Sequence, residues 1–155
     1  MSNLDLRSGA GGRVEAEGDN IAAQVDTALN DSDKTFTVPA GKTWKLSSLS
    51  ASLITTGTAG NRQMRIEIGD GANVIWFKNF GQVQTASLTR TYFAAPDLVD
   101  DAAFNAGGQI RLWLLGYTLP AGYTIRIYDS AAIAATADDL SIWLIVDART
   151  AGARI

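Results

Sequence analysis

The chain has 155 residues and a formal net charge of −3, and it contains neither cysteine nor histidine. Ser-His-Asp triads, Cys-His pairs and zinc sites built on His or Cys are therefore excluded. The 13 basic residues are spread singly, so we do not expect nucleic acid as a partner. No apolar run reaches the ~18 residues of a membrane span, and the first residues lack the apolar core of a signal peptide. We expect a soluble protein of one domain, made in the cytoplasm.

Residues 1–18 form a polar, glycine-rich segment without sustained hydrophobic periodicity. A segment of this composition cannot bury enough apolar surface to order itself alone. We therefore predict an extended N-terminal arm that is either disordered or laid on a neighbouring subunit. The side chains in it that are candidates for such contacts are Leu4, Leu6, Arg7 and Arg13.

One pattern occurs twice, at residues 36–46 and 117–127: aromatic, Thr, aliphatic, Pro-Ala-Gly, variable, Thr, apolar, basic, aliphatic. The alternation on either side of Pro-Ala-Gly predicts a strand, a tight turn and a second strand, which together form a hairpin. Pro39 and Pro120 are expected at the second position of a type I turn, and Gly41 and Gly122 at the fourth, with positive φ. The repeat indicates either two Greek-key halves or one good turn used twice.

The rest of the chain alternates short apolar segments with Gly-, Asn- and Asp-rich turns, which is typical of strands. Residues 21–29 fit a helix or a strand, and we favour a strand that pairs with the one through Phe36. The apolar parity shifts across Ser47-Ser48, which indicates a β-bulge or a change of sheet. Residues 98–104 fit a helical turn or a short strand, and 149–155 form a tail. The other predicted strands are 42–56, 64–68, 74–80, 83–93, 110–115 and 140–146.

Eight or nine strands at short spacing predict an all-β protein, an antiparallel β-sandwich of the jelly-roll type over residues 19–155. On the last strand, Trp143 and Ile145 point away from the face formed by its other apolar residues. The strands at 74–80 and 110–115 are also apolar on both faces. A lone sandwich wets the outer face of each sheet, so this pattern favours a homo-oligomer, most simply a homotrimer.

Two further observations bear on that interpretation. Charged residues make up 19% of the chain, below the usual ~25%, either because partners cover part of the surface or because the β surface is rich in Thr, Ser and Gly. The four tryptophans all fall on predicted strands, and core filling is the first expectation for them. A subunit interface and an exposed platform for sugars are the alternatives. The residues concerned are Trp44, Trp76, Trp113 and Trp143.

Acidic residues recur in the predicted turns, and oxygen ligands in loops can hold Ca²⁺. No stretch matches a calcium loop with a closing Glu, so solvated turn residues are favoured over a metal site. No two carboxylates are marked as a facing pair for acid–base work. We therefore expect no enzyme activity, no cofactor, no metal and no small-molecule substrate. The turns in question hold Asp31 and Asp33, Asp70 and Asn73, Asp97, Asp100 and Asp101, and Asp138 and Asp139.

The stretch 30–46, with its phrase Phe-Thr-Val-Pro-Ala-Gly-Lys-Thr-Trp-Lys-Leu, resembles small virion proteins of tailed bacteriophages, in particular the capsid decoration (cement) type. The second Pro-Ala-Gly segment and the closing strand fit the same style. The resemblance implies a β-sandwich, often trimeric, that sits on the outer capsid surface and contacts the major capsid protein. It brings no catalytic residues. A glycan- or host-binding jelly-roll module of a spike or fibre, and a tail or neck component, are the alternative functions.

Overall fold

The computed structural model describes residues 20–98 and 108–152. The predicted arm at 1–18, most of the segment at 98–104 and the last three residues of the predicted tail lie outside these ranges. The described residues contain ten strands and no helix: β1 (Asn20–Asp26), β2 (Asp33–Thr37), β3 (Lys42–Ile54), β4 (Met64–Gly69), β5 (Val74–Asn79), β6 (Thr89–Ala95), β7 (Gln109–Trp113), β8 (Thr118–Leu119), β9 (Thr124–Asp129) and β10 (Asp139–Thr150).

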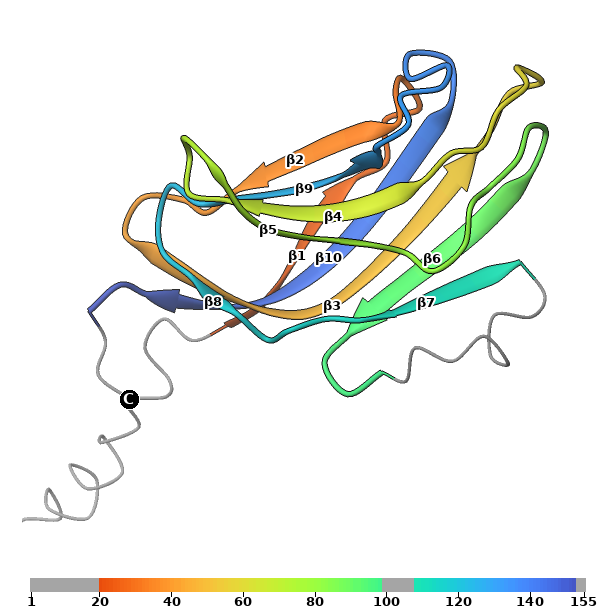
Figure 1. Ribbon diagram of the computed structural model, residues 1–155. Helices are drawn as coiled ribbons and strands as arrows, with labels where there is room; N and C mark the ends of the chain where they lie inside the picture. The colour runs from red at the N-terminus through yellow and green to blue at the C-terminus, as the bar shows by residue number, and fades with distance from the viewer. Residues whose placement is uncertain (1–19, 99–107, 153–155) are drawn as a thin grey trace, which may run out of the picture.

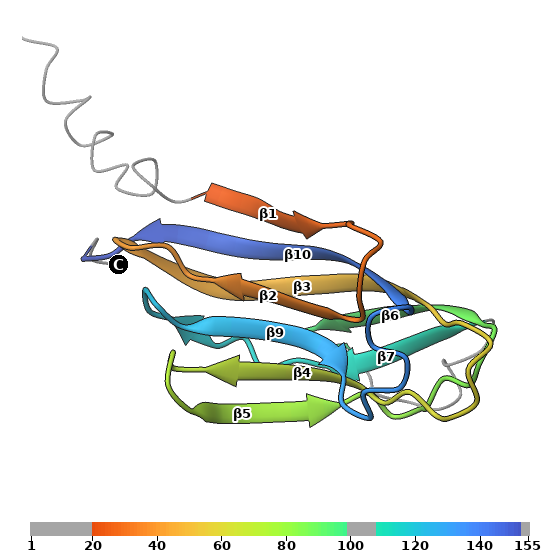
Figure 2. The ribbon, with the colours of Figure 1, turned by 90° about the horizontal axis from the view of Figure 1, so that it is seen from above.

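The strands form two sheets that face each other, with sheet B above sheet A in Figure 1. Sheet A has the order β1-β10-β3-β6-β7, and β8 also pairs with β3, whereas sheet B has the order β2-β9-β4-β5, which Figure 2 shows from above. The antiparallel pairs β1–β10, β2–β9, β3–β6 and β4–β5 are those of one long hairpin rolled into a sandwich. The predicted jelly roll is therefore confirmed. The additions are β8 and β7, which lies parallel to β6.

The core lies between the sheets and follows from the alternation of apolar side chains along the strands. On β10, Leu140, Ile142, Leu144 and Val146 are at most 1% exposed, while the intervening Trp143 points outward. Burying a side chain of this size stabilises the fold by about 1.5–3 kcal/mol. Sheet B contributes the facing side chains Met64, Ile66, Ile68, Ile125 and Ile127.

A β-bulge interrupts β3 where the sequence parity shifts. Ser48 pairs with Ile145 and Leu46 with Val146, so Ser47 is the extra residue without a partner on β10. Because one residue is added, Leu46 and Leu49 both point into the core and are 1% and 2% exposed. The predicted bulge is confirmed, and β3 stays in one sheet along its whole length.

The Pro-Ala-Gly turns join the two sheets and do not close hairpins, so that prediction is wrong. β2 belongs to sheet B and β3 to sheet A, and the same change of sheet separates β9 from β8. The Lys42 amide donates to the Pro39 carbonyl at 3.1 Å, which places Pro39 first and Gly41 third in the turn. Gly41 has φ +73°, as a type II turn requires at its third position. Pro120 and Gly122, with φ +86°, occupy the equivalent positions.

The two copies of the pattern lie side by side in opposite directions. Phe36 pairs with Ile125 in sheet B, and Trp44 pairs with Leu119 in sheet A. Between these pairs the Val38 amide donates to the Tyr123 carbonyl, and the Gly122 amide donates to the Val38 carbonyl, both at 2.9 Å. The repeat is therefore one structural unit, in which each copy supplies the neighbour of the other in both sheets.

Three further expectations need correction. β1 is a strand, but it pairs with β10 in sheet A and not with the strand through Phe36. The predicted tail is partly strand, because β10 continues to Thr150. The expectation that every tryptophan fills the core holds only for Trp44, which is 3% exposed; Trp76 is half-buried, and Trp113 and Trp143 are 39% and 41% exposed.

Gly41→Val should destabilise the fold by about 1–3 kcal/mol, the cost of a left-handed conformation for a residue other than glycine. No atom lies within 4 Å of a Cβ built at Gly41, so the cost comes from the backbone and not from a clash. Urea denaturation measures it. Gly41→Asn should recover much of the loss, because Asn tolerates this conformation. Equal stability of Gly41→Val and the wild type would contradict the assignment.

Candidate functional site

A buried ion pair ties two loops together at the end of the sandwich remote from the Pro-Ala-Gly turns. Arg62 and Asp138 are both 0% exposed, and Arg62 Nε donates to Asp138 Oδ2 at 2.6 Å. Arg62 Nη1 also donates to the Thr58 and Gly60 carbonyls, at 2.7 and 3.0 Å. Burial alone would raise the pKa of Asp138, but hydrogen bonds from Arg62 and Thr56 outweigh burial and hold this pKa below its usual value. The pair has a structural role.

Lys34 lies on β2, and its side chain reaches into the turn after β1, where oxygen atoms surround its ammonium group. Its side chain is 3% exposed, and its Nζ donates to the Ala28 carbonyl at 2.9 Å. Asp31 Oδ1 lies 3.0 Å from the same Nζ and Asp26 Oδ1 lies 3.6 Å from it. These are oxygen ligands of the kind that loops offer to Ca²⁺, but here they surround an ammonium group of the chain itself. The acidic turn at Asp31 thus has an internal cation.

Two further acidic residues of the predicted turns, Asp70 and Asp33, also have local partners. Asp70 Oδ1 accepts hydrogen bonds from the Asn73 and Ala72 amides at 2.7 and 2.8 Å, and these bonds lower its pKa. Asp33 forms an ion pair with Arg126. Within residues 20–98 and 108–152, no three His, Cys, Asp or Glu side chains gather into a possible metal site. Asp100 and Asp101 lie outside the described residues.

The outer face of sheet B carries a connected network of polar side chains. Arg126 Nε donates to Asp33 Oδ1 at 2.9 Å, and the Tyr128 hydroxyl donates to Glu67 Oε2 at 2.8 Å. The Arg126 guanidinium carbon also lies 3.9 Å from the centre of the Tyr128 ring. Burial, and then the bond to Glu67, raise the pKa of Tyr128. Arg65 continues the network across β4, 4.4 Å from the centre of the Phe77 ring. The charged side chains of this network therefore have their partners on the same face.

The outer face of sheet A is different, because its centre has no charged side chain. The register places Val25 beside Trp143, Trp143 beside Ser50, and Ser50 beside Phe93. Val25 is 52% exposed and Trp143 41%. We call this surface the apolar face. The register assigns to it Ile21, Ala23 and Val25 on β1, Ser141, Trp143 and Ile145 on β10, Ser48, Ser50, Ser52 and Ile54 on β3, and Thr89, Thr91, Phe93 and Ala95 on β6. The edge strand β7 borders it with Gln109, Arg111 and Trp113.

Of the candidate contact residues taken from the sequence, Trp143 and Ile145 lie together on the apolar face. Leu4, Leu6, Arg7 and Arg13 lie outside the described residues. The structure adds residues that we did not single out, above all Ile21, which is 81% exposed, and Val25. Their alternation along β1 was a signal, but only the pairing with β10 shows that they share a face with Trp143.

An apolar hollow of about 210 Å³ opens beside β5, between the two sheets. Trp76 and Tyr117 meet there edge to face, with ring centres 5.7 Å apart, and a bulge at Ile75 turns that side chain toward them. Thr118 adds a hydroxyl group to this lining. The hollow offers aromatic surface without carboxylate or amide side chains, which sugar recognition by hydrogen bonds would need.

Comparisons with known proteins find only distant similarities to solved structures. No protein-family model matches the sequence, and no curated protein is significantly similar to it. Among solved structures, the infectious bursal disease virus Gx strain shows 12% identity over 87% of this chain, with a TM-score of 0.27. The VP2 subviral particle of that virus shows 14% identity over 87%, with a TM-score of 0.26.

The chain spans 38% of the length of the first of these viral chains and 29% of the second. TM-scores this low do not establish a shared fold. The jelly-roll assignment therefore rests on the strand pairs of this chain. No helix among the described residues could cross a membrane.

Asp138→Asn should destabilise the protein at pH 7 by about 3–5 kcal/mol, because it leaves the Arg62 charge buried without a counterion. The pKa of Asp138 is lowered in the folded state, so the ion pair contributes fully above the ordinary aspartate value of ~3.9. Its contribution declines as the pH falls through the folded value. Urea denaturation between pH 7 and pH 3 should thus show the two proteins converging on the acid side.

Asp139→Asn is the matched control, because it changes the neighbouring carboxylate at the start of β10. Its effect should stay within about 0.5 kcal/mol across the same range. A constant difference between wild type and Asp138→Asn down to pH 3 would contradict the role given to the ion pair.

Proposed function

We propose that this protein is a structural component of a virion, which decorates the outer surface of a capsid as a homo-oligomer. The observation that carries this proposal is the contrast between the two outer faces of the sandwich. The outer face of sheet B carries a network of its own charged side chains, and its exposed apolar side chains Val74, Ile75 and Phe77 are confined to the edge strand β5. The centre of the outer face of sheet A has no such network and exposes Val25 and Trp143. Exposed apolar patches of this kind mark interaction surfaces.

The described polar groups favour a structural role over a catalytic one. The buried charged side chains among the described residues, Lys34, Arg62, Asp129 and Asp138, join loops and turns. The hollow beside β5 is lined by no carboxylate. The resemblance of the Pro-Ala-Gly stretch to phage decoration proteins supports the same class of function and adds the virion as its location.

The mechanism we propose is modest area combined with multivalency. In this proposal each protomer contributes a contact of modest area to the capsid. Linking three protomers raises the effective concentration of each remaining contact once the first has formed. We propose a homotrimer on the major capsid protein, with residues 19–155 as the folded unit and residues 1–18 as an arm that contacts neighbouring subunits.

A glycan-binding module of a spike or fibre is the competing function, and the position of the exposed tryptophans disfavours it. Trp143 lies in the middle of a strand between Val25 and Ser50, and Lys78 Nζ lies 5.4 Å from the centre of the Trp113 ring. A sugar platform would instead place such a ring beside acidic or amide side chains in a concave loop region. Binding on a glycan array would reverse this preference.

Replacing the apolar face should abolish assembly without unfolding the protomer. The double variant Val25→Ser/Trp143→Ser removes two neighbouring exposed side chains, and light scattering at micromolar concentration should give a monomer mass for it and an oligomer mass for the wild type. Val74→Ser is the matched control, because Val74 is 54% exposed but lies on sheet B. It should leave the mass unchanged.

A wild-type protein that is monomeric at micromolar concentration, or a double variant that assembles like the wild type, would contradict the assembly proposal. The location is tested on purified virions. Antibodies against the folded protein should label intact particles, and a map of the particle should show the chain outside the shell. Particles that lack the chain would overturn the proposed function.

A further inference from the structure

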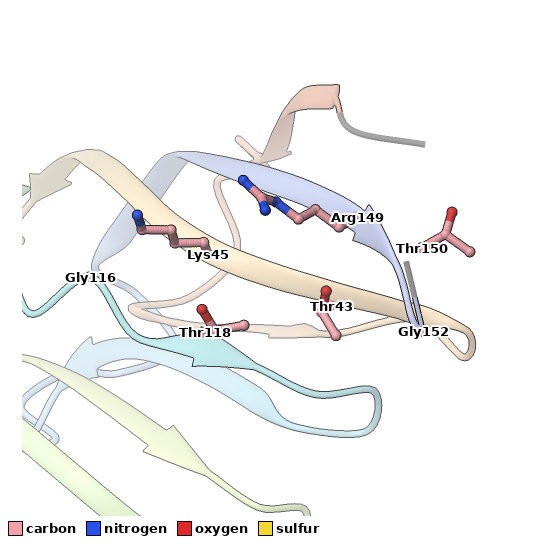
Figure 3. Close-up of a pocket in the computed structure, with 7 residues that line it drawn as sticks. All are labelled: Thr43, Lys45, Gly116, Thr118, Arg149, Thr150 and Gly152. Atoms are coloured by element: carbon pink, nitrogen blue, oxygen red, sulfur yellow. The ribbon is translucent and has the colours of Figure 1, made fainter. Parts of the chain in front are cut away.

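The apolar face ends, near the Pro-Ala-Gly turns, in a polar pocket that the proposed function does not use. Figure 3 shows this pocket, which has a volume of about 390 Å³ and is formed by β3, β8 and β10. Lys45 lies opposite Asp147 on β10 and opposite Thr118 on β8, and Thr43 lies opposite Arg149. The side chains that matter here are Thr43, Lys45, Thr118, Arg149 and Thr150. We call it the corner pocket.

The corner pocket is cationic, although the chain as a whole carries a net charge of −3. Lys45 and Arg149 extend on the same side of the sheet in Figure 3. Asp147 accepts a hydrogen bond from Arg149 Nη2 at 2.8 Å, and Lys42 Nζ donates to Thr150 Oγ1 at 3.4 Å. Two cationic side chains, Lys45 and Arg149, therefore lie on the face that carries one carboxylate, Asp147.

Lys45 is the cation that is open to a ligand. Its side chain is exposed, and within the described residues it has neither a hydrogen bond nor an ion pair. Gly116 lies close beside its aliphatic stem, since a Cβ built at Gly116 would be 3.7 Å from Lys45 Cε. Thr43 and Thr118 add hydroxyl groups on the same face. An ammonium group with hydroxyl donors around it is suited to an oxyanion.

We infer that the corner pocket binds the carboxylate of an Asp or Glu side chain that a protein partner presents. An acidic sugar carries the same group, but the described lining of the pocket holds no aromatic side chain, so it lacks the stacking surface typical of sugar sites. The inference rests on the proposed function and deepens it. It states that the surface of the major capsid protein that meets this corner of the protomer carries an acidic side chain.

The test uses the full chain and a peptide probe, hexaglutamate, followed by amide chemical shifts in NMR spectra. Hexaglutamate should shift the amides of Thr43, Lys45 and Thr118, and glucuronate at the same concentration should not. Lys45→Gln should weaken hexaglutamate binding about tenfold, as expected for the loss of one charge-assisted hydrogen bond. Lys78→Gln removes the same charge from sheet B and should leave the affinity within about twofold of the wild type.

Thr118→Val provides a second variant that keeps the side-chain shape and removes a hydroxyl, so a loss of binding with an unchanged thermal transition would support the pocket. Equal affinity of the wild type and Lys45→Gln, or tighter binding of glucuronate than of hexaglutamate, would overturn the inference. The amount of protein bound to purified particles distinguishes a failure of this inference from a failure of the proposed function. A chain that coats particles equally well with and without Lys45 keeps its function and loses this site.

Discussion

The whole sandwich depends on the backbone pairing between the two Pro-Ala-Gly segments. Val38 exchanges hydrogen bonds with Gly122 and Tyr123 at the point where both segments leave one sheet for the other. This fixes β2 beside β9 in sheet B and β3 beside β8 in sheet A. Because packed sheets lie ~10 Å apart, two neighbouring crossings that run in opposite directions set the separation that the core side chains must fill. The repeated sequence thus forms a turn in each copy and also sets the distance between the two sheets.

Periodicity predicted most strands and even the bulge in β3, because burial of one face imposes a period of two that any insertion breaks. It could not predict the neighbours. The alternation in Ile21–Val25 is the same whether β1 lies beside β10 or beside β2. Likewise Pro39 and Gly41 form the same local turn whether the strands on either side pair with each other or diverge. Strand partners are decided by contacts far apart in sequence, which no local pattern contains.

The candidate sites also differ in whether the sequence alone could reveal them. Trp143 and Ile145 were recognisable because they alternate with a buried row on one strand. The corner pocket was not, because Lys45, Thr118 and Arg149 come from three separate segments. The acidic turns were ambiguous for a third reason: whether Asp31 holds a metal or an ammonium depends on where Lys34 points. The sequence shows which side chains carry a charge, but only the fold shows which group of opposite charge lies beside each of them.

The position of β10 has a consequence for biosynthesis. It lies between β1 and β3 in sheet A, although it follows nine other described strands along the chain. A nascent chain that has emerged only as far as β9 therefore lacks the strand that joins its first element to the rest. Sheet B needs none of the later residues and is available sooner. Contacts this distant in sequence close slowly, so sheet A should be completed only after β10 leaves the ribosome, and the apolar face should form together with it.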